Sequence, residues 1–387
     1  MGPSDPLDFY DVTALLSEDE RLIRDTVGRF VDREVTPIMA DCFAAERFPS
    51  ELVPRLAELG LFGATLHGYG CPGLGATAYG VVCEELERGD SSVRSCVSVQ
   101  SSLVMGAIHA FGSEEQRTQW LPQLARGAKL GCFALTESHG GSDPSRMRTR
   151  ARRRGGDWTL DGAKHWITNG ALADVAVVWA ASEEGVNAFL VEKGTSGFES
   201  RVIKNKLSLR ASSTAELSLV DVRVPDGARL PEATGIKAAL KCLDDARFGI
   251  SWGACGAARA CIDTVLRYTQ SRELFGRPLS HTQLIQARLA DDVRKLTAAQ
   301  LIAWRLAKLK EQGAAGSAQV SLAKWNNVRA ALDIARDCRD MLGAAGITLD
   351  HVPMRHMLNL ETVITYEGTE SIHELIVGRA LTGQGAF

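Results

Sequence analysis

The order in which two kinds of hydrophobic periodicity follow one another most constrains the fold of this chain. Apolar residues recur at helical spacing in the first third, short runs rich in β-branched residues fill the middle, and long helical patterns return from about residue 237. Parallel sheets built from βαβ units need strands and helices to alternate, and this order does not provide that. We therefore predict an α+β protein with a β domain inserted between two helical parts.

The length of the chain also requires more than one packed unit. At 387 residues it exceeds the size at which a single hydrophobic core usually stops growing. The change of pattern predicts an N-terminal helical domain over 1–130, a middle antiparallel β domain over 131–236 and a C-terminal helical bundle domain over 237–387. Its long helices are expected near 237–270, 281–312 and 316–342, with a final one near 371–380.

Local signals place the shorter elements. Ser17 and Glu20 form a capping box at a helix start, and Thr36-Pro37 is expected to end that helix. Further helical patterns cover about 50–59, 77–87 and 103–124, the last split at 111–113. The middle strands are expected over 158–160, 175–180, 188–191 and 216–224.

Composition excludes several classes of function. A net charge of -3 gives no reason to expect a nucleic-acid partner. We expect a basic run to face solvent, with contact to a phosphate group of a ligand or to a partner protein as the alternative; its residues are Arg148, Arg150, Arg152, Arg153 and Arg154. No apolar run approaches the roughly 18 residues of a membrane span, so a cytoplasmic protein is expected. The nine cysteines form no CxxC pair and the eight histidines no HExxH motif, so the sequence predicts neither disulfides nor a metal site.

A glycine motif raises the alternative of a nicotinamide dehydrogenase. Residues 68–73 match GxGxxG, the dinucleotide-binding fingerprint. That fingerprint requires a strand-to-helix turn, whereas Pro72, Gly73 and Gly75 prolong a loop here. A surface turn is the favoured interpretation.

Several longer motifs occur in one order along nearly the whole chain. They are GCFALTE at 131–137 with GSD at 141–143, KHWITN at 164–169, RELFG at 272–276 with Gln283, DMLG at 340–343 and YEGT at 366–369. Together they resemble the acyl-CoA dehydrogenase family, and most closely its glutaryl-CoA dehydrogenase branch. The resemblance implies the three-domain order above, FAD as cofactor, a CoA thioester as substrate, a homotetramer, and an electron-transferring flavoprotein as electron acceptor.

The resemblance also assigns a catalytic base. Dehydrogenation of an unactivated Cα–Cβ bond needs a base for the weakly acidic α-proton and a hydride acceptor on the other side of the substrate. Glu367, in the YEGT motif, corresponds to the base, and Gly368 leaves room for a thioester close to the backbone. A desolvated thioester beside it should raise the pKa of the Glu367 carboxyl.

The same resemblance implies the cofactor contacts. Residues of the first two motifs would contact the flavin, Arg272 would pair with the pyrophosphate of a neighbouring subunit's FAD, and Phe275 and Gln283 would lie near its adenosine. The full set is Phe133, Leu135, Thr136, Gly141, Ser142, Trp166, Thr168, Arg272, Phe275, Gln283, Gly343, Thr369 and Phe387.

Substrate contacts follow from the segment at 87–105 and its partners. In the resembled branch, Arg94 and Ser95 hold the distal carboxylate of the acyl chain, while Glu87 and Tyr366 accompany decarboxylation. Arg247 corresponds to a residue on the CoA path, and Ser142 and Gly368 complete the predicted substrate set. The alternative for Arg94 is an ion pair with Glu87 or Asp90.

The chain departs from the branch pattern at Ala344-Ala345, Ile364, Glu370-Ser371 and Cys71. A specialised relative that acts on another carboxylated or oxygenated thioester, or that lets reduced flavin meet O2, therefore stays open. A non-catalytic flavoprotein is a further alternative, which the intact YEGT motif disfavours.

Overall fold

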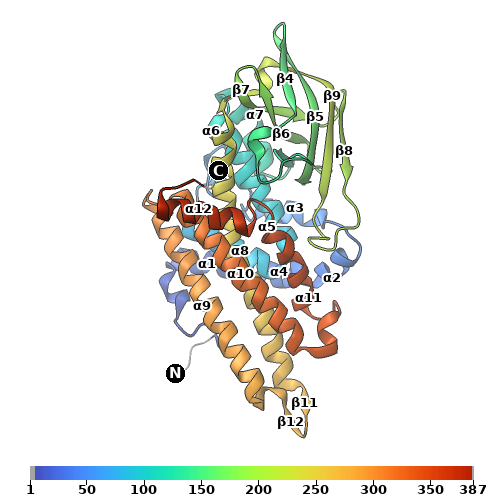
Figure 1. Cartoon of the computed structure of the whole chain (residues 1–387). Helices are drawn as coiled ribbons and strands as arrows, with labels where there is room; N and C mark the ends of the chain where they lie inside the picture. The colour runs from blue at the N-terminus through green and yellow to red at the C-terminus, as the bar shows by residue number, and fades with distance from the viewer. Residues whose placement is uncertain (1–4, 386–387) are drawn as a thin grey trace.

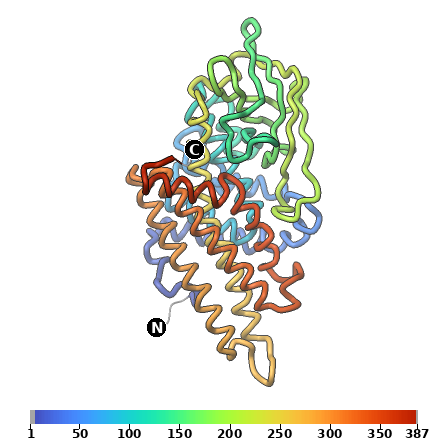
Figure 2. The backbone as a smooth tube through the Cα atoms, in the orientation of Figure 1, coloured from blue at the N-terminus to red at the C-terminus, as the bar shows by residue number. Residues whose placement is uncertain are grey.

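The computed structural model describes residues 5–385 and confirms the predicted order of helices, strands and helices. Figure 1 shows an elongated molecule with the β sheet at one end and the short β11–β12 hairpin at the other. The tube in Figure 2 traces the first and last thirds of the chain running side by side through the helical part. The chain is thus an α+β protein with the β domain carried between two helical regions.

The N-terminal helices begin at the predicted capping box. Ser17 Oγ accepts from Glu20 N at 3.2 Å, and Glu20 Oε2 accepts from Ser17 N at 2.7 Å. The helices of this region are α1 (Glu18–Phe30), α2 (Thr36–Ala44), α3 (Val53–Glu58), α4 (Ala76–Gly89), α5 (Ser91–Ser98), α6 (Gly106–Phe111) and α7 (Glu114–Ala125).

The prediction that Thr36-Pro37 ends the first helix is wrong. The backbone passes through one π-helical segment, Val31–Val35, and continues as α2, with Pro37 in its first turn. Thr36 N donates to Val31 O, five residues back. Because the first turn of a helix tolerates proline's missing N–H, Pro37 does not interrupt the helix here.

The middle domain is one eight-stranded sheet within the described residues, ordered β10-β7-β6-β4-β5-β9-β8 with β3 against β6. Most neighbours are antiparallel, as predicted, but β6 has two parallel neighbours: β3, from the Gly131–Val175 pair onward, and β4, at the Arg150–Ala181 pair. The strands are β3 (Gly131–Ala134), β4 (Arg150–Arg154), β5 (Asp157–Thr168), β6 (Val175–Ser182), β7 (Gly185–Glu192), β8 (Phe198–Val202), β9 (Thr214–Pro225) and β10 (Arg229–Thr234).

The C-terminal helices confirm the predicted long segments. They are α8 (Ile236–Ser271), α9 (Gln283–Glu311), α10 (Ser317–Met341), α11 (Val352–Val363) and α12 (Glu370–Thr382), with β11 (Glu273–Leu274) and β12 (Arg277–Pro278) between α8 and α9. In Figure 1, α12 lies across the end of this bundle that faces the sheet. The helices α5 and α11 were not predicted from the sequence.

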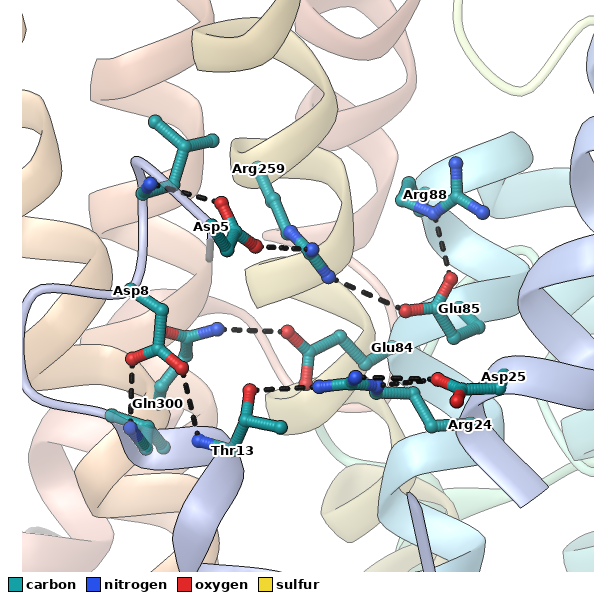
Figure 3. Close-up of polar contacts among 12 residues, drawn as sticks. Asp5, Asp8, Thr13, Arg24, Asp25, Glu84, Glu85, Arg88, Arg259 and Gln300 are labelled. Atoms are coloured by element: carbon teal, nitrogen blue, oxygen red, sulfur yellow. Dashed lines mark hydrogen bonds and ion pairs between the residues drawn. The ribbon is translucent and has the colours of Figure 1, made fainter. Parts of the chain in front are cut away.

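The N-terminal segment is fastened to the bundle by a polar cluster (Figure 3). Arg259 of α8 donates to Asp5 at 2.6 Å and to Glu85 at 3.4 Å, and Gln300 of α9 donates to Glu84 at 3.0 Å. Glu84 and Glu85 are buried on α4, so these contacts compensate carboxylates that have lost water. The cluster therefore holds the N-terminal segment, α4, α8 and α9 in one arrangement.

The glycine motif at 68–73 lies in a two-residue hairpin. Its strands, β1 (His67–Gly68) and β2 (Cys71–Pro72), pair antiparallel around Tyr69 and Gly70, both with positive φ. This is the predicted turn, and it lacks the strand-to-helix geometry of the fingerprint. The nine cysteines are free thiols, and the five arginines of the basic run at 148–154 are exposed. Among the helices described, none is long and apolar enough to cross a membrane.

Candidate active site

A strained turn between α11 and α12 carries Glu367. Its φ of 52° lies in the left-handed region, which costs a non-glycine residue roughly 1–2 kcal/mol. Arg247 Nε donates to Glu367 O at 2.7 Å, while Lys324 Nζ donates to Gly368 O at 2.6 Å and also to Tyr366 O. Two cationic side chains therefore bind the carbonyls of three consecutive residues and hold the turn in this conformation.

The Glu367 carboxyl is placed to act as a base. Its Oε2 is buried and has no hydrogen-bond partner among residues 5–385. Burial raises the pKa of this carboxyl, and the positive charges of Arg94, Lys324 and Arg247 partly oppose that rise. A carboxylate that is desolvated yet surrounded by cations is a stronger proton acceptor than an exposed one while remaining ionisable.

A buried ion pair lies next to this turn. Arg94 of α5, 1% exposed, donates from Nε to Glu87 of α4 at 2.6 Å and from Nη2 to the Tyr366 hydroxyl. Burial opposes the charge on Arg94, but Glu87 and Tyr366 raise its pKa. Gly253 of α8 makes room for the pair, because a Cβ there would lie 2.0 Å from Glu87 Oε2.

In the structure, Arg94 therefore forms an ion pair, which was the alternative interpretation of this residue. Its partner is Glu87, whereas Asp90 pairs with Arg355 of α11. The guanidinium already has a buried anion, so its burial alone does not require a dicarboxylic substrate. The pair is nevertheless incomplete: Glu87 Oε1 has no partner among the described residues, and no hydrogen bond joins Arg94 Nη1 to any of them.

The two predicted flavin segments lie side by side in the β domain. His165 N on β5 donates to Thr136 O at 2.9 Å, and Lys164 Nζ donates to Leu135 O at 3.0 Å and to Glu137 at 2.8 Å. Burial lowers the pKa of Lys164 to about 8, against the opposing effect of Glu137. This buried pair fixes the spacing of the two segments.

The side chains at this junction fit a flavin. Trp166 is 57% exposed at a φ of 62°, so its indole offers a free face to a planar ring. Thr136 and Thr168 are half-buried, and Phe133 and Leu135 are buried. Gly141 and Ser142 are exposed on the following loop.

The remaining predicted cofactor residues are not brought together in one chain. Arg272, Phe275 and Gln283 are exposed around the β11–β12 hairpin, at the end of the molecule opposite the sheet (Figure 1). Phe275 is fully exposed, which fits a contact outside its own chain. Further sites are Gly343, with a φ of 61° at the end of α10, and Thr369, which caps α12; Phe387 lies outside the described residues.

Sequence reasoning missed two buried residues beneath the turn. Lys324 on α10 is 1% exposed, and His373 on α12 is also 1% exposed. Burial, with the charges of Lys324 and Arg247, lowers the pKa of His373 to about 3, so its ring is neutral. The sequence signal for Lys324 is its position: this lysine shares one face of the helix with Val320, Val328 and other core residues.

The departures from the branch pattern have local roles. Glu370 pairs with Arg329 and accepts from Trp325 Nε1 at 3.1 Å, which fastens α12 to α10. Ile364 packs on the core of the C-terminal bundle. Ala344 and Ala345 lie between two retained glycines, of which Gly346 is required because a Cβ there would lie 2.0 Å from Arg339 O.

Three family models match consecutive parts of the chain. They are the acyl-CoA dehydrogenase N-terminal domain over residues 17–128, the middle domain over 132–222 and the C-terminal domain over 233–382. With the fold and the Glu367 turn, these matches show that the chain belongs to the acyl-CoA dehydrogenase family. It is thus an FAD-dependent oxidoreductase that acts on acyl-CoA thioesters.

Individual relatives point to two branches. The chain is 52% identical, with a TM-score of 0.98, to a glutaryl-CoA dehydrogenase from Mycobacterium smegmatis in complex with FADH2, over 99% of both chains. A second structure of glutaryl-CoA dehydrogenase from that organism is 54% identical, with a TM-score of 0.97, over 98% of this chain and 99% of the other. The mitochondrial short-chain specific acyl-CoA dehydrogenase of Bos taurus is 37% identical, over 94% of this chain and 90% of the relative.

Proposed function

We propose that this protein catalyses the oxidative decarboxylation of glutaryl-CoA to crotonyl-CoA and carbon dioxide, with Glu367 as the base. The observation that carries the proposal is the incomplete pairing of buried Arg94, whose Nη1 donates to no described residue although its Nη2 contacts Tyr366, the residue next to Glu367. This contact puts a guanidinium beside the base, where the far end of a short dicarboxylic acyl group would lie. The identity of 52–54% to glutaryl-CoA dehydrogenases adds support.

The first step is removal of the α-proton by Glu367. Its raised pKa matches a weak carbon acid better than an exposed carboxylate would, and Arg247 and Lys324 keep the carboxyl in place through the turn backbone. The predicted substrate residues Ser95, Ser142 and Gly368 would line the acyl and thioester path. Bound FAD would be held by the Thr136 and Trp166 segments and would supply the hydride acceptor for the β-carbon.

Decarboxylation follows from the position of the distal carboxylate. Once the α,β double bond has formed, carbon dioxide can leave from the γ-carbon because its electron pair passes into a dienolate conjugated with the thioester. The proton that Glu367 removed then returns to the γ-carbon and gives crotonyl-CoA. The unpaired N–H groups of Arg94 would bind the carboxylate before it leaves.

The second candidate is a non-decarboxylating dehydrogenase of short acyl groups. The ion pair of Arg94 with Glu87 favours it, since the guanidinium charge is already compensated without a substrate carboxylate. The identity of 37% to a short-chain specific enzyme agrees with it. A specialised relative for another carboxylated or oxygenated thioester is the third candidate, on account of Ala344, Ala345 and Ile364.

We also propose a homotetramer that passes electrons to an electron-transferring flavoprotein. Arg272, Phe275 and Gln283 lie at the end of the chain away from its own Trp166 segment, so they can complete an FAD site only in a neighbouring subunit.

An anaerobic screen tests the substrate. The purified holoenzyme is mixed with glutaryl-CoA, butyryl-CoA and other CoA thioesters, and the loss of flavin absorbance is followed. The proposal expects glutaryl-CoA to bleach the flavin fastest. Faster bleaching by butyryl-CoA would favour the second candidate, and bleaching by neither would favour the third.

A further inference from the structure

Lys324 has an unusual environment for a lysine. The residue is 1% exposed, yet its two hydrogen-bond acceptors among the described residues are main-chain carbonyls, those of Tyr366 and Gly368. These carbonyls flank Glu367 on both sides. The Lys324 ammonium also lies 5.8 Å from the centre of the Tyr366 ring. A hydroxyl has one donor and could bind only one of these carbonyls, whereas the ammonium has three donors and binds both.

Arg94, Lys324 and Arg247 all favour the charged form of Glu367, and Lys324 is the one of the three without a salt bridge to another carboxylate among the described residues. Arg247 of α8 is paired with Asp244 at 2.9 Å, and Arg94 is paired with Glu87. On α12, His373 is neutral and Glu370 is paired with Arg329. Burial lowers the pKa of Lys324, and the Glu367 charge is the effect that opposes this.

The conformation of the turn depends on the same contacts. Glu367 and Gly368 have φ values of 52° and 102°, both in the region that side chains disfavour. A Cβ on Gly368 would lie 3.0 Å from the His373 ring. The backbone therefore passes through a narrow space, and the carbonyls on both sides of the base point to one ammonium.

We propose that Lys324 is a positioning residue for the base: it fixes the backbone on both sides of Glu367 and supplies the buried positive charge that keeps this carboxyl ionised. The inference rests on the proposed role of Glu367. It assigns no contact between Lys324 and the substrate. Lys324 acts through the turn, and it sets both where the carboxylate points and the pH at which it can accept a proton.

The test is the pH dependence of flavin reduction in Lys324→Met. Methionine fills the space of the lysine stem without its charge or donors. We expect a variant that folds and keeps FAD, with anaerobic reduction by the best wild-type substrate at least tenfold slower at neutral pH. The acidic limb of its pH profile should move to higher pH by about 1 unit, since a cation that stabilised the Glu367 carboxylate has been removed.

A readout without turnover accompanies the kinetics. Infrared difference spectra of the substrate-free holoenzyme during a pH titration should contain a carboxylic-acid band that is absent in Glu367→Gln. The midpoint of that band should rise in Lys324→Met. Lys206→Met is the matched control, because Lys206 also donates to two backbone carbonyls, those of Leu209 and Ser212, but its charged neighbours are Glu46, Arg210 and Lys204. Lys206→Met should change neither the midpoint of the carboxylic-acid band nor the acidic limb of the pH profile.

Lys324→Gln and Lys324→Arg complete the series. Glutamine keeps a donor but not the charge, so it should shift the acidic limb as methionine does; arginine keeps the charge and should restore the wild-type limb. The proposal would be overturned if folded Lys324→Met had the wild-type acidic limb in its pH profile and the wild-type midpoint for the carboxylic-acid band. Loss of fold and FAD in both neutral variants would also overturn it, because Lys324 would then be purely structural. Failure of the proposed function would give a different result. In that case no CoA thioester would reduce the flavin of the wild-type enzyme, or the thioester that reduces it would still reduce the flavin of Glu367→Gln.

Discussion

At the scale of single residues, Glu367 and its buried neighbours determine the proposed chemistry. Burial raises the pKa of the Glu367 carboxyl, and the positive charges of Arg94, Lys324 and Arg247 limit this rise. Those cations keep the group ionisable in a place where desolvation alone would neutralise it. A base in this position should lose activity below its pKa, so flavin reduction by substrate should fall as the pH falls through the raised value.

Glu367→Gln tests the base directly. The amide keeps the shape of the side chain but cannot take up a proton, so flavin reduction should fall by several orders of magnitude, while FAD content and Tm stay near wild type. Stopped-flow bleaching under anaerobic conditions measures the rate. Rapid bleaching of this variant would assign the base to another residue.

Arg94→Gln tests recognition of the distal carboxylate. Loss of a charge-assisted contact of roughly 1.5–3 kcal/mol should lower kcat/KM for glutaryl-CoA by about tenfold to 150-fold, and for butyryl-CoA far less. The variant leaves Glu87 buried and unpaired, so its Tm should also fall.

The double variant Arg94→Gln/Glu87→Gln separates these two effects. It removes both charges of the pair, so stability should recover in part while selectivity for glutaryl-CoA stays lost. Equal losses for glutaryl-CoA and butyryl-CoA in both variants would mean that Arg94 serves only the fold.

At the scale of helices, one close approach sets how α4 and α8 cross. A Cβ on Gly256 of α8 would lie 1.8 Å from Glu84 O, so the two helices touch through their backbones. The same crossing brings Glu87 close to Gly253 and so sets the position of Arg94, the partner of Glu87. The position of the Arg94–Glu87 ion pair therefore depends on small residues in α8.

Gly256→Ala should accordingly destabilise the protein by about 1–3 kcal/mol, because α4 and α8 must separate. Differential scanning of the holoenzyme should give a Tm several degrees lower. Gly378→Ala in α12 is the matched control, since its Cβ meets no described atom within 4 Å. It should leave the Tm unchanged or raise it, and an equal loss in both variants would contradict this view of the crossing.

Much of the helical structure could be predicted from the sequence. Periodicity located the long helices α8, α9 and α10, and the capping box located the start of α1, because these signals act within a few residues. The continuation past Thr36-Pro37 was missed because a π-helical segment, which has no clear sequence signal, precedes the proline. The role of Lys324 was missed because its carbonyl partners lie 42 and 44 residues away in sequence.

At the scale of the whole molecule, the residues predicted to contact FAD lie in two groups, at opposite ends of the molecule. The Trp166 segment lies in the sheet, while Arg272 and Phe275 lie beyond the opposite end of the bundle (Figure 1). One chain cannot bring them to one cofactor. Assembly and FAD binding should therefore be linked.

Phe275→Ser tests that link. The side chain is fully exposed in its own chain, so the substitution should not affect folding of the subunit, but it should weaken FAD binding at least tenfold. Fluorescence titration of the apoprotein with FAD, together with light scattering, gives affinity and assembly. Val220→Ser is the control, since Val220 on β9 is 66% exposed and lies in the sheet of the middle domain. Unchanged FAD affinity in Phe275→Ser would place this residue outside the cofactor site.

The products formed from glutaryl-CoA test the central claim most directly. Wild-type enzyme is incubated with glutaryl-CoA carrying labelled carbon in its distal carboxylate and with an artificial electron acceptor; thioesters and released gas are then quantified. The arrangement of Glu367, Tyr366, Arg94 and Glu87 predicts crotonyl-CoA and labelled carbon dioxide in equal amounts. Accumulation of glutaconyl-CoA, with no labelled gas, would contradict it.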